Sequence, residues 1–145
     1  MAKPAPRVVS EIMTSDVVSV SEDDTLSALV QSMRAMRFRH TPVTDGDRLV
    51  GLLTERDLLS ASASSLLPSR ESDEFLQRRF HVRDVMTRDV TTVSPSTSLK
   101  QAAELMLKRR IGCLPVVDEK NVLVGIVTSS DFLELAISLL SETTS

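Results

Sequence analysis

The chain has 145 residues, of which 41% are hydrophobic and 26% charged, and its net charge is −3. This size and composition suit one globular domain or two small halves that share a core. The negative charge argues against broad electrostatic binding to nucleic acid or to an anionic membrane surface. One cysteine, Cys113, excludes an internal disulfide and a cysteine-cluster metal site.

The sequence contains no recognisable targeting or membrane-spanning segment and lacks the large aromatic residues Trp and Tyr. No apolar run approaches the length of a membrane span, and the first ten residues, MAKPAPRVVS, lack the apolar core of a signal peptide. We therefore expect a cytoplasmic protein that has no membrane partner. The chain has no Trp and no Tyr, so it lacks the stacking platforms typical of single-strand binding proteins, and a nucleic-acid partner is not expected. Residues 1–7 and 141–145 are expected to fray.

The first half of the chain predicts a strand, a helix, a hairpin and a second helix. Val17–Val20 is a short β-branched run typical of a strand. Apolar residues then recur at helical spacing, namely Leu26, Leu29, Val30 and Met33. Thr41–Thr44 and Leu49–Leu53 flank the turn residues DGDR and predict a β-hairpin. A helix is expected near Glu55–Leu66.

The second half of the chain predicts the same order of elements. Val90–Val93 predicts a strand, and a helix is predicted by the apolar positions Leu99, Ala102, Ala103 and Met106. Cys113–Val117 and Val122–Val127 flank DEKN and predict a second hairpin, and Ser129–Leu140 predicts the last helix. Each half therefore reads as β-α-β-β-α.

The two halves are copies of one unit. A shift of 73 residues, which becomes 74 after one extra residue in the second hairpin turn, aligns a Met-Thr pair, a glycine, a threonine and an aspartate. The aligned positions are Met13-Thr14 with Met86-Thr87, Gly51 with Gly125, Thr54 with Thr128 and Asp57 with Asp131. Two copies are too few for a solenoid, so we expect them to pair face to face around one core.

A unit that opens with Met-Thr and closes with Thr-x-x-Asp resembles the cystathionine-β-synthase (CBS) domain. The resemblance implies CBS repeat 1 at residues 8–66, a linker at residues 67–81 and CBS repeat 2 at residues 82–140. It implies an α/β fold of the α+β type, in which two β-α-β-β-α repeats pack with pseudo-twofold symmetry and form two clefts at their interface. Such pairs, called Bateman modules, commonly bind adenosine ligands, form homodimers and regulate a partner protein.

The Thr-x-x-Asp motif, Thr54 with Asp57 and Thr128 with Asp131, has two interpretations. A threonine at a strand–helix junction caps the helix, and an aspartate in the first turn favours the helix dipole. Alternatively, a carboxylate accepts hydrogen bonds from both hydroxyls of a ribose, while the first-turn N–H groups attract phosphate. The residues alone favour the cap. The resemblance to CBS domains and the repetition favour ribose binding by both aspartates.

The second motif precedes the middle strand of each repeat, as RFRHTPV and RRIGCLPV. In CBS domains, backbone groups just before this proline meet the adenine, and the residues two and three places before it often contact phosphate. The ligand-binding residues that the resemblance implies here are Arg39, His40, Thr41 and Pro42 in repeat 1, and Gly112, Cys113, Leu114 and Pro115 in repeat 2.

The two predicted sites differ in charge. Arg39, His40 and Arg56 accompany the first motif, TERD, whereas the second motif, TSSD, offers only neutral donors. Because arginine donates well to phosphate oxygens, we hypothesise that the Asp57 site takes the more phosphorylated ligand. The Asp131 site then takes a less charged adenosine ligand or stays empty. The alternative is that Arg39 and Arg56 are solvated surface charges.

Three functions compete at this point. The first is a regulatory module that binds AMP, ADP or ATP, or S-adenosylmethionine, requires no cofactor and signals to a partner on another chain. The second is a ligand-independent interaction module with degenerate clefts, and the intact Thr-x-x-Asp of both repeats favours the first function over it. The third is an enzyme, for which the sequence offers no nucleophile–base set, metal-ligand cluster or glycine-rich phosphate loop.

Overall fold

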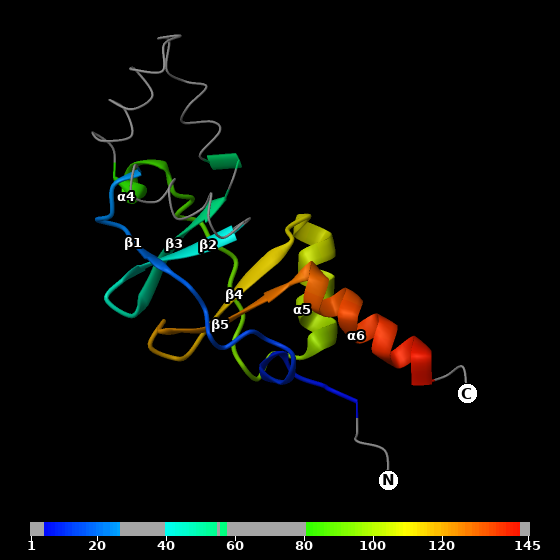
Figure 1. Cartoon of the computed structure of the whole chain (residues 1–145). Coiled ribbons are helices and arrows are strands. Elements are labelled where there is room, and N and C mark those ends of the chain that lie inside the picture. The colour runs from blue at the N-terminus through cyan, green and yellow to red at the C-terminus, as the bar shows by residue number, and fades with distance from the viewer. Residues whose placement is uncertain (1–4, 27–39, 55, 58–80, 143–145) are drawn as a thin grey trace. The chain divides into compact units, whose positions relative to one another are not determined.

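The computed structural model describes residues 5–26, 40–54, 56–57 and 81–142. The chain divides into two compact units, which are described separately: unit 1 comprises Met1–Val17 with Thr91–Ser145, and unit 2 comprises Val18–Val90. Unit 2 is therefore inserted between two segments of unit 1. The chain leaves unit 1 after Val17 and re-enters it at Thr91 (Figure 1).

Unit 2 contains a three-stranded sheet with strand order β1-β2-β3. Its strands are β1 (Val20–Ser21), β2 (His40–Asp45) and β3 (Arg48–Thr54). β1 runs parallel to β2, and β2 runs antiparallel to β3. The predicted hairpin is confirmed, with Gly46 at φ 65° in its turn, a backbone angle that glycine tolerates without strain. Both predicted helices of this half lie largely outside the described residues.

The first predicted strand, Val17–Val20, is shorter than expected. Only Val20 of that run belongs to β1, while Val18 is 47% exposed and pairs with no strand. The cause is the chain path, because Val17 and Val18 lie where the chain passes from one unit to the other. A β-branched run predicts an extended backbone there but not a sheet partner.

The segment that opens the second sequence repeat packs on unit 2. Helix α4 (Val82–Val85) begins where the backbone N–H of Val82 donates to the carbonyl of Asp24 at 2.8 Å. Thr87 then exchanges two backbone hydrogen bonds of 2.9 Å with Leu52 in β3. Buried side chains of this segment and of the preceding part of unit 2 form one core. Its members are Leu26, Val43, Leu53, Val82 and Met86.

Unit 1 contains the elements predicted for the second half of the chain. They are α5 (Leu99–Arg109), the antiparallel hairpin of β4 (Cys113–Val117) and β5 (Leu123–Thr128), and α6 (Ser129–Glu142), and a short 3-10 helix, η1 (Val9–Glu11), joins them from the N-terminal segment. Ser98 caps α5 by accepting a hydrogen bond from the Gln101 N–H at 3.0 Å. The predicted strand Val90–Val93 is reduced to a single parallel bridge between Val93 and Val116.

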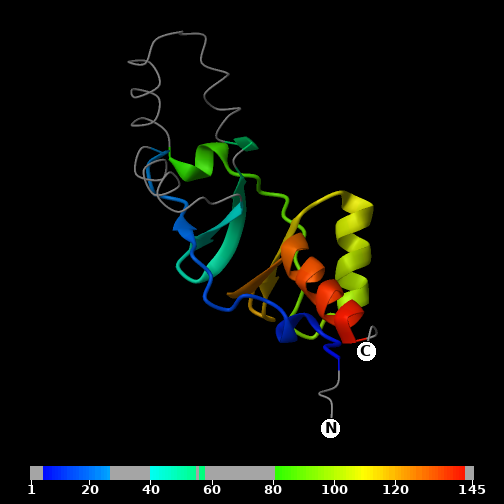
Figure 2. The same cartoon turned by 45° about the vertical axis from the view of Figure 1, so that its right-hand side comes forward.

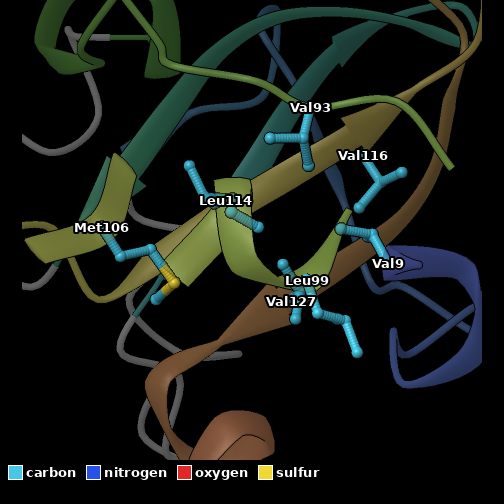
Figure 3. Packing of buried hydrophobic residues seen from close by; sticks show 8 residues of the cluster. Val9, Val93, Leu99, Met106, Leu114, Val116 and Val127 are labelled. Atoms are coloured by element: carbon cyan, nitrogen blue, oxygen red, sulfur yellow. The ribbon is translucent and has the colours of Figure 1, made fainter. Parts of the chain in front are cut away.

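The core of unit 1 draws on both of its chain segments. Val9 of η1 meets side chains of α5, β4 and β5 in one apolar cluster (Figure 3), whose labelled members are Val9, Val93, Leu99, Met106, Leu114, Val116 and Val127. Helices α5 and α6 lie on the same side of the β4–β5 hairpin (Figure 2). No helix in the described part of the chain is long and apolar enough to cross a membrane.

A methionine and a glycine make the same close contact in each unit. A Cβ added at Gly51 would lie 2.5 Å from Sδ of Met86 and 3.0 Å from the carbonyl oxygen of Thr87. A Cβ added at Gly125 would lie 2.5 Å from Sδ of Met13 and 3.0 Å from the carbonyl oxygen of Thr14. Each glycine therefore makes room for the Met-Thr pair that opens the other sequence repeat.

The sequence repeats and the compact units thus divide the chain differently. The Met-Thr segment of repeat 1 packs in unit 1, on the hairpin of repeat 2, and the Met-Thr segment of repeat 2 packs in unit 2. The domain boundaries 8–66, 67–81 and 82–140 describe the repetition in the sequence, and they stay a prediction.

Candidate functional site

The first Thr-x-x-Asp motif forms a reciprocal helix cap. Thr54 is the last residue of β3, and its backbone N–H donates to Oδ2 of Asp57 at 2.9 Å. The backbone N–H of Asp57 donates back to Oγ1 of Thr54 at 3.1 Å. This is the geometry of a capping box, with aspartate in the place of glutamate. Residues 56–57 have helical backbone, and Arg56 is exposed.

The second motif repeats this arrangement with one difference. Thr128 ends β5, and its backbone N–H donates to Oδ2 of Asp131 at 2.8 Å. The hydroxyl of Thr128 donates to the same oxygen at 3.2 Å, whereas the hydroxyl of Thr54 accepts a bond from its own helix. The helix-cap interpretation is therefore confirmed for Thr54, whereas the Thr128 hydroxyl donates to Asp131 and accepts no helix N–H among the described residues. Each half-buried carboxylate still has a second oxygen, Oδ1, that the cap does not use.

Strand pairing brings the two predicted motifs of each repeat together. In unit 2, His40 lies opposite Thr54 in the β2–β3 ladder. In unit 1, Cys113 lies opposite Thr128, and the N–H of Ser129 donates to the carbonyl of Gly112 at 3.0 Å. The motif before the proline and the Thr-x-x-Asp motif thus share one end of each hairpin. Arg39, the remaining predicted member, lies outside the described residues.

Burial narrows the set of residues that a ligand can reach. The side chains of Thr41, Pro42, Leu114 and Pro115 are fully buried and belong to the interior of their units. His40 and Gly112 are half-buried at the ends of those segments, and Arg56 is exposed. The predicted site residues that are not buried are therefore the two aspartates, the two threonines Thr54 and Thr128, and His40, Arg56 and Gly112.

Cys113 is a buried, protonated thiol. Only 3% of the residue is exposed, and burial, with a smaller effect from the charge of Asp131, raises its pKa to about 12. A thiol with such a pKa carries almost no thiolate near neutral pH, so Cys113 is not a nucleophile. Within the described ranges, no group of three or more His, Cys, Asp and Glu side chains is arranged to hold a metal ion.

One polar residue at the Asp57 site was missed by the sequence analysis. The hydroxyl of Thr87 lies 3.2 Å from Oδ1 and 3.4 Å from Oδ2 of Asp57, and it donates to this carboxylate. Thr87 is the threonine of the second Met-Thr pair, 30 residues after Asp57 in the chain. The repetition of Met-Thr was a signal that this pair matters, but nothing local in the sequence shows that it packs on the other repeat.

A cavity of about 540 Å³ in unit 1 lies elsewhere. It is lined by the start of α5 and by residues at the far end of β4, among them Ser94, Gln101 and Asp118. None of the predicted site residues lines it, because Gly112 and Cys113 stand at the opposite end of β4. The cavity is therefore separate from the site built on Asp131.

Both sequence repeats match the model of a known protein family. The family model described as CBS domain matches residues 9–64 and 82–138. The chain belongs to the CBS domain family. A CBS domain-containing protein from Dictyostelium discoideum is 35% identical over 135 residues, which are 92% of this chain and 93% of that protein.

Solved structures of CBS domains share the fold of the chain. The structure of an acetoin utilization protein, AcuB, from Vibrio cholerae has a TM-score of 0.79 and 37% identity, and the match covers 98% of this chain and 99% of that one. CBSX2, solved in complex with AMP, has a TM-score of 0.78 and 26% identity over 92% of this chain and 98% of that one. These neighbours confirm the predicted α+β fold.

Two further similarities bear on ligands and on enzyme activity. The CBS domain pair of protein MJ0100, solved with 5′-methylthioadenosine and S-adenosyl-L-methionine, has a TM-score of 0.76 and 25% identity, and the match covers 93% of this chain and 98% of that one. Inosine-5′-monophosphate dehydrogenase from Methanocaldococcus jannaschii is 33% identical over 131 residues, but the chain spans only 24% of that enzyme. The likeness is to a CBS domain pair, which is a regulatory rather than a catalytic region.

Proposed function

We propose that this CBS pair is a regulatory module that binds an adenosine nucleotide and signals its occupancy to a partner protein. The observation that carries the proposal is the repeated carboxylate at a helix start, with Oδ2 of each aspartate engaged in the cap and Oδ1 left over by it. CBS pairs of the same fold have been solved with AMP and with S-adenosyl-L-methionine, which supports an adenosine ligand.

In this proposal each group at the site has a chemical task. Oδ1 of Asp57 and of Asp131 accepts hydrogen bonds from the ribose hydroxyls. The N–H groups at the starts of the two helices attract the phosphates. The adenine edge meets backbone groups near His40 in unit 2 and near Gly112 and Cys113 in unit 1.

The two proposed sites differ in charge, and this difference predicts different ligand preferences. Arg56 occupies the position that Ser130 holds in the second repeat, and its exposed guanidinium is available to a phosphate beside Asp57. His40 lies opposite Thr54, where the second repeat has the neutral, buried Cys113. We therefore propose that the Asp57 site prefers ADP or ATP, and that the Asp131 site takes a less charged ligand such as AMP or S-adenosylmethionine.

The protein is also proposed to form homodimers. Helix α6 exposes an apolar stripe on the side away from its core contacts, formed by Leu133, Ile137 and Leu140 at 64%, 65% and 65% exposure. Phe132 and Leu135 of the same helix pack on the core of unit 1. A helix with two apolar faces buries one in its own fold and offers the other to a partner. The cytoplasmic location stays a prediction.

A titration of AMP, ADP, ATP and S-adenosylmethionine tests the binding proposal. A ligand present at 100 times its Kd stabilises a protein by about 2.7 kcal/mol, so a thermal-shift screen detects it. Calorimetric titrations of Asp57→Ala and Asp131→Ala then assign the sites. We expect Asp57→Ala to weaken ATP binding more than AMP binding. Equal losses for both variants with every ligand would refute the difference between the sites.

The second candidate function is a ligand-independent interaction module. The observation in its favour is that each aspartate already accepts the backbone N–H of the threonine three residues earlier, so the fold has a use for it without a ligand. Asp57→Asn distinguishes the two functions, because the amide oxygen keeps an acceptor for the Thr54 N–H while the negative charge is lost. No thermal shift with any adenosine ligand favours the interaction module, whereas ligand binding that weakens in Asp57→Asn favours the regulatory module.

A further inference from the structure

The two proposed ribose-binding aspartates accept different sets of hydrogen bonds within the fold. Asp57 accepts the Thr87 hydroxyl at 3.2 Å from Oδ1 and 3.4 Å from Oδ2. Thr14 holds the same position as Thr87 in the other repeat, and among the described residues no hydrogen bond joins it to Asp131. Among the described residues, Oδ1 of Asp131 therefore has no donor, while Oδ1 of Asp57 accepts the Thr87 hydroxyl.

The Thr87 side chain offers Asp57 the same kind of donor as the proposed ligand does, namely an aliphatic hydroxyl. An aliphatic hydroxyl that donates to a carboxylate makes the same kind of bond as a ribose hydroxyl does. The Thr87 bond is long and is shared between two oxygens, so it is weaker than a well-aligned O–H···O bond of about 2.7 Å. A ribose can displace it, but the free energy of that bond is then subtracted from the binding free energy.

We propose that Thr87 is an internal competitor for the ribose at Asp57, so that an adenosine ligand without phosphate contacts fills the Asp131 site first. The inference rests on the proposed function and adds a specificity residue to it. Because the ribose gains less at Asp57, binding there depends more on phosphate contacts such as that of Arg56. The Asp57 site should therefore discriminate more strongly against unphosphorylated adenosine than the Asp131 site does.

The backbone of Thr87 is held independently of its side chain. Two hydrogen bonds of 2.9 Å join its N–H and carbonyl to Leu52 in β3, and the preceding Met86 is buried in the core of unit 2. Replacing the hydroxyl by a methyl group in Thr87→Val keeps the β-branched shape and these backbone bonds. The substitution thus removes the competing donor without removing the segment.

The experiment measures AMP affinity by calorimetry with one site left intact at a time. In an Asp131→Ala background, where only the Asp57 site remains, Thr87→Val is expected to tighten AMP binding about three- to tenfold, the range set by one modest hydrogen bond. Thr87→Ser keeps the hydroxyl and is expected to bind as the background does. Thr14→Val in an Asp57→Ala background is the matched control and should leave AMP affinity unchanged.

The possible results separate this inference from the proposed function. If AMP binds in both backgrounds and Thr87→Val leaves its affinity unchanged or weaker, the competitor role is wrong and the proposed function stands. An equal gain from Thr14→Val also overturns the competitor role, because the effect is then not tied to the Thr87 bond. If AMP and adenosine bind in neither background nor to the unmodified protein, both proposals fail.

Discussion

Thr41 and Leu114 hold the same position of the two repeats, but Thr41 carries a hydroxyl into a core. Both side chains are fully buried, and Oγ1 of Thr41 has no hydrogen-bond partner in the part of the chain that the structure describes. A buried hydroxyl without a partner costs about 1–3 kcal/mol relative to a solvated one. Leu114, which lies in the apolar cluster of unit 1, carries no such cost.

We predict that Thr41→Val raises the free energy of unfolding by about 1 kcal/mol, because the methyl group fills the same volume without an unsatisfied donor. Urea denaturation followed by circular dichroism measures this change. The matched control is Val116→Thr, which places a hydroxyl at a fully buried position of unit 1 and should lower stability by about 1–3 kcal/mol. A loss of stability in Thr41→Val would show that its hydroxyl has a partner.

Cys113 predicts a specific dependence of stability on pH. Its pKa is raised from 9.0 to about 12 in the folded chain, so between these values the folded state holds a proton that the unfolded state releases. The thiol's contribution to stability is therefore complete below pH 9 and is lost as the pH rises toward 12, by about 1.4 kcal/mol per pH unit.

The measurement compares urea unfolding of the unmodified protein and of Cys113→Ala at about pH 8 and pH 10. Over that interval the unmodified protein should lose about 1.4 kcal/mol more than the variant. In parallel, a disulfide reagent should modify the folded thiol far more slowly than the denatured one, because Cys113 is only 3% exposed. Parallel pH profiles for the two proteins would contradict the raised pKa.

At the scale of elements, the hairpins and helices followed from local patterns, but the partners of the Met-Thr segments did not. β2, β3, β4, β5, α5 and α6 follow hydrophobic periodicity, turn residues and caps that lie within each element. The packing of Met86 on Gly51 joins residues of different repeats. A local sequence pattern does not predict which repeat such a segment contacts. For the same reason, the site prediction that named Asp57 did not include Thr87.

Gly51 and Met86 should show this contact as an energetic coupling. We predict that Gly51→Ala lowers stability by about 1–3 kcal/mol, because the new Cβ would meet Met86 Sδ at 2.5 Å and the Thr87 carbonyl oxygen at 3.0 Å. Met86→Ala removes the sulfur contact and leaves only the 3.0 Å contact with the Thr87 carbonyl oxygen. The double variant should therefore be more stable than the sum of the two single effects implies, which a double-mutant cycle in urea measures.

The equivalent pair in unit 1, Gly125 with Met13, is a matched comparison for this cycle. Its added Cβ would lie 2.5 Å from the methionine sulfur, as in unit 2, so the coupling energies of the two cycles should be similar. Strict additivity in both cycles would mean that the sulfur contacts do not set the position of the Met-Thr segments.

At the scale of the whole molecule, the chain path ties the two units together. Each unit is built from both sequence repeats, since residues 1–17 belong with the second repeat and residues 82–90 with the first. Neither repeat alone therefore contains a complete core: Val9 is missing from an isolated second repeat, and Val82 and Met86 are missing from an isolated first repeat. A fragment that ends at residue 66 and a fragment that begins at residue 82 should therefore both fold poorly.

The exposed apolar stripe of α6 is the homodimer contact that we propose. Leu133, Ile137 and Leu140 recur at a spacing of four and three residues, so they line one side of the helix, and each is more than 60% exposed. Two copies of such a stripe can bury it against each other.

Ile137→Glu places a charge in that contact and should convert the dimer to a monomer, which light scattering after size exclusion measures directly. Ser138→Glu adds the same charge on the adjacent face, where it should leave the mass unchanged. A monomeric unmodified protein, or a dimer that survives Ile137→Glu, would assign the stripe to another partner.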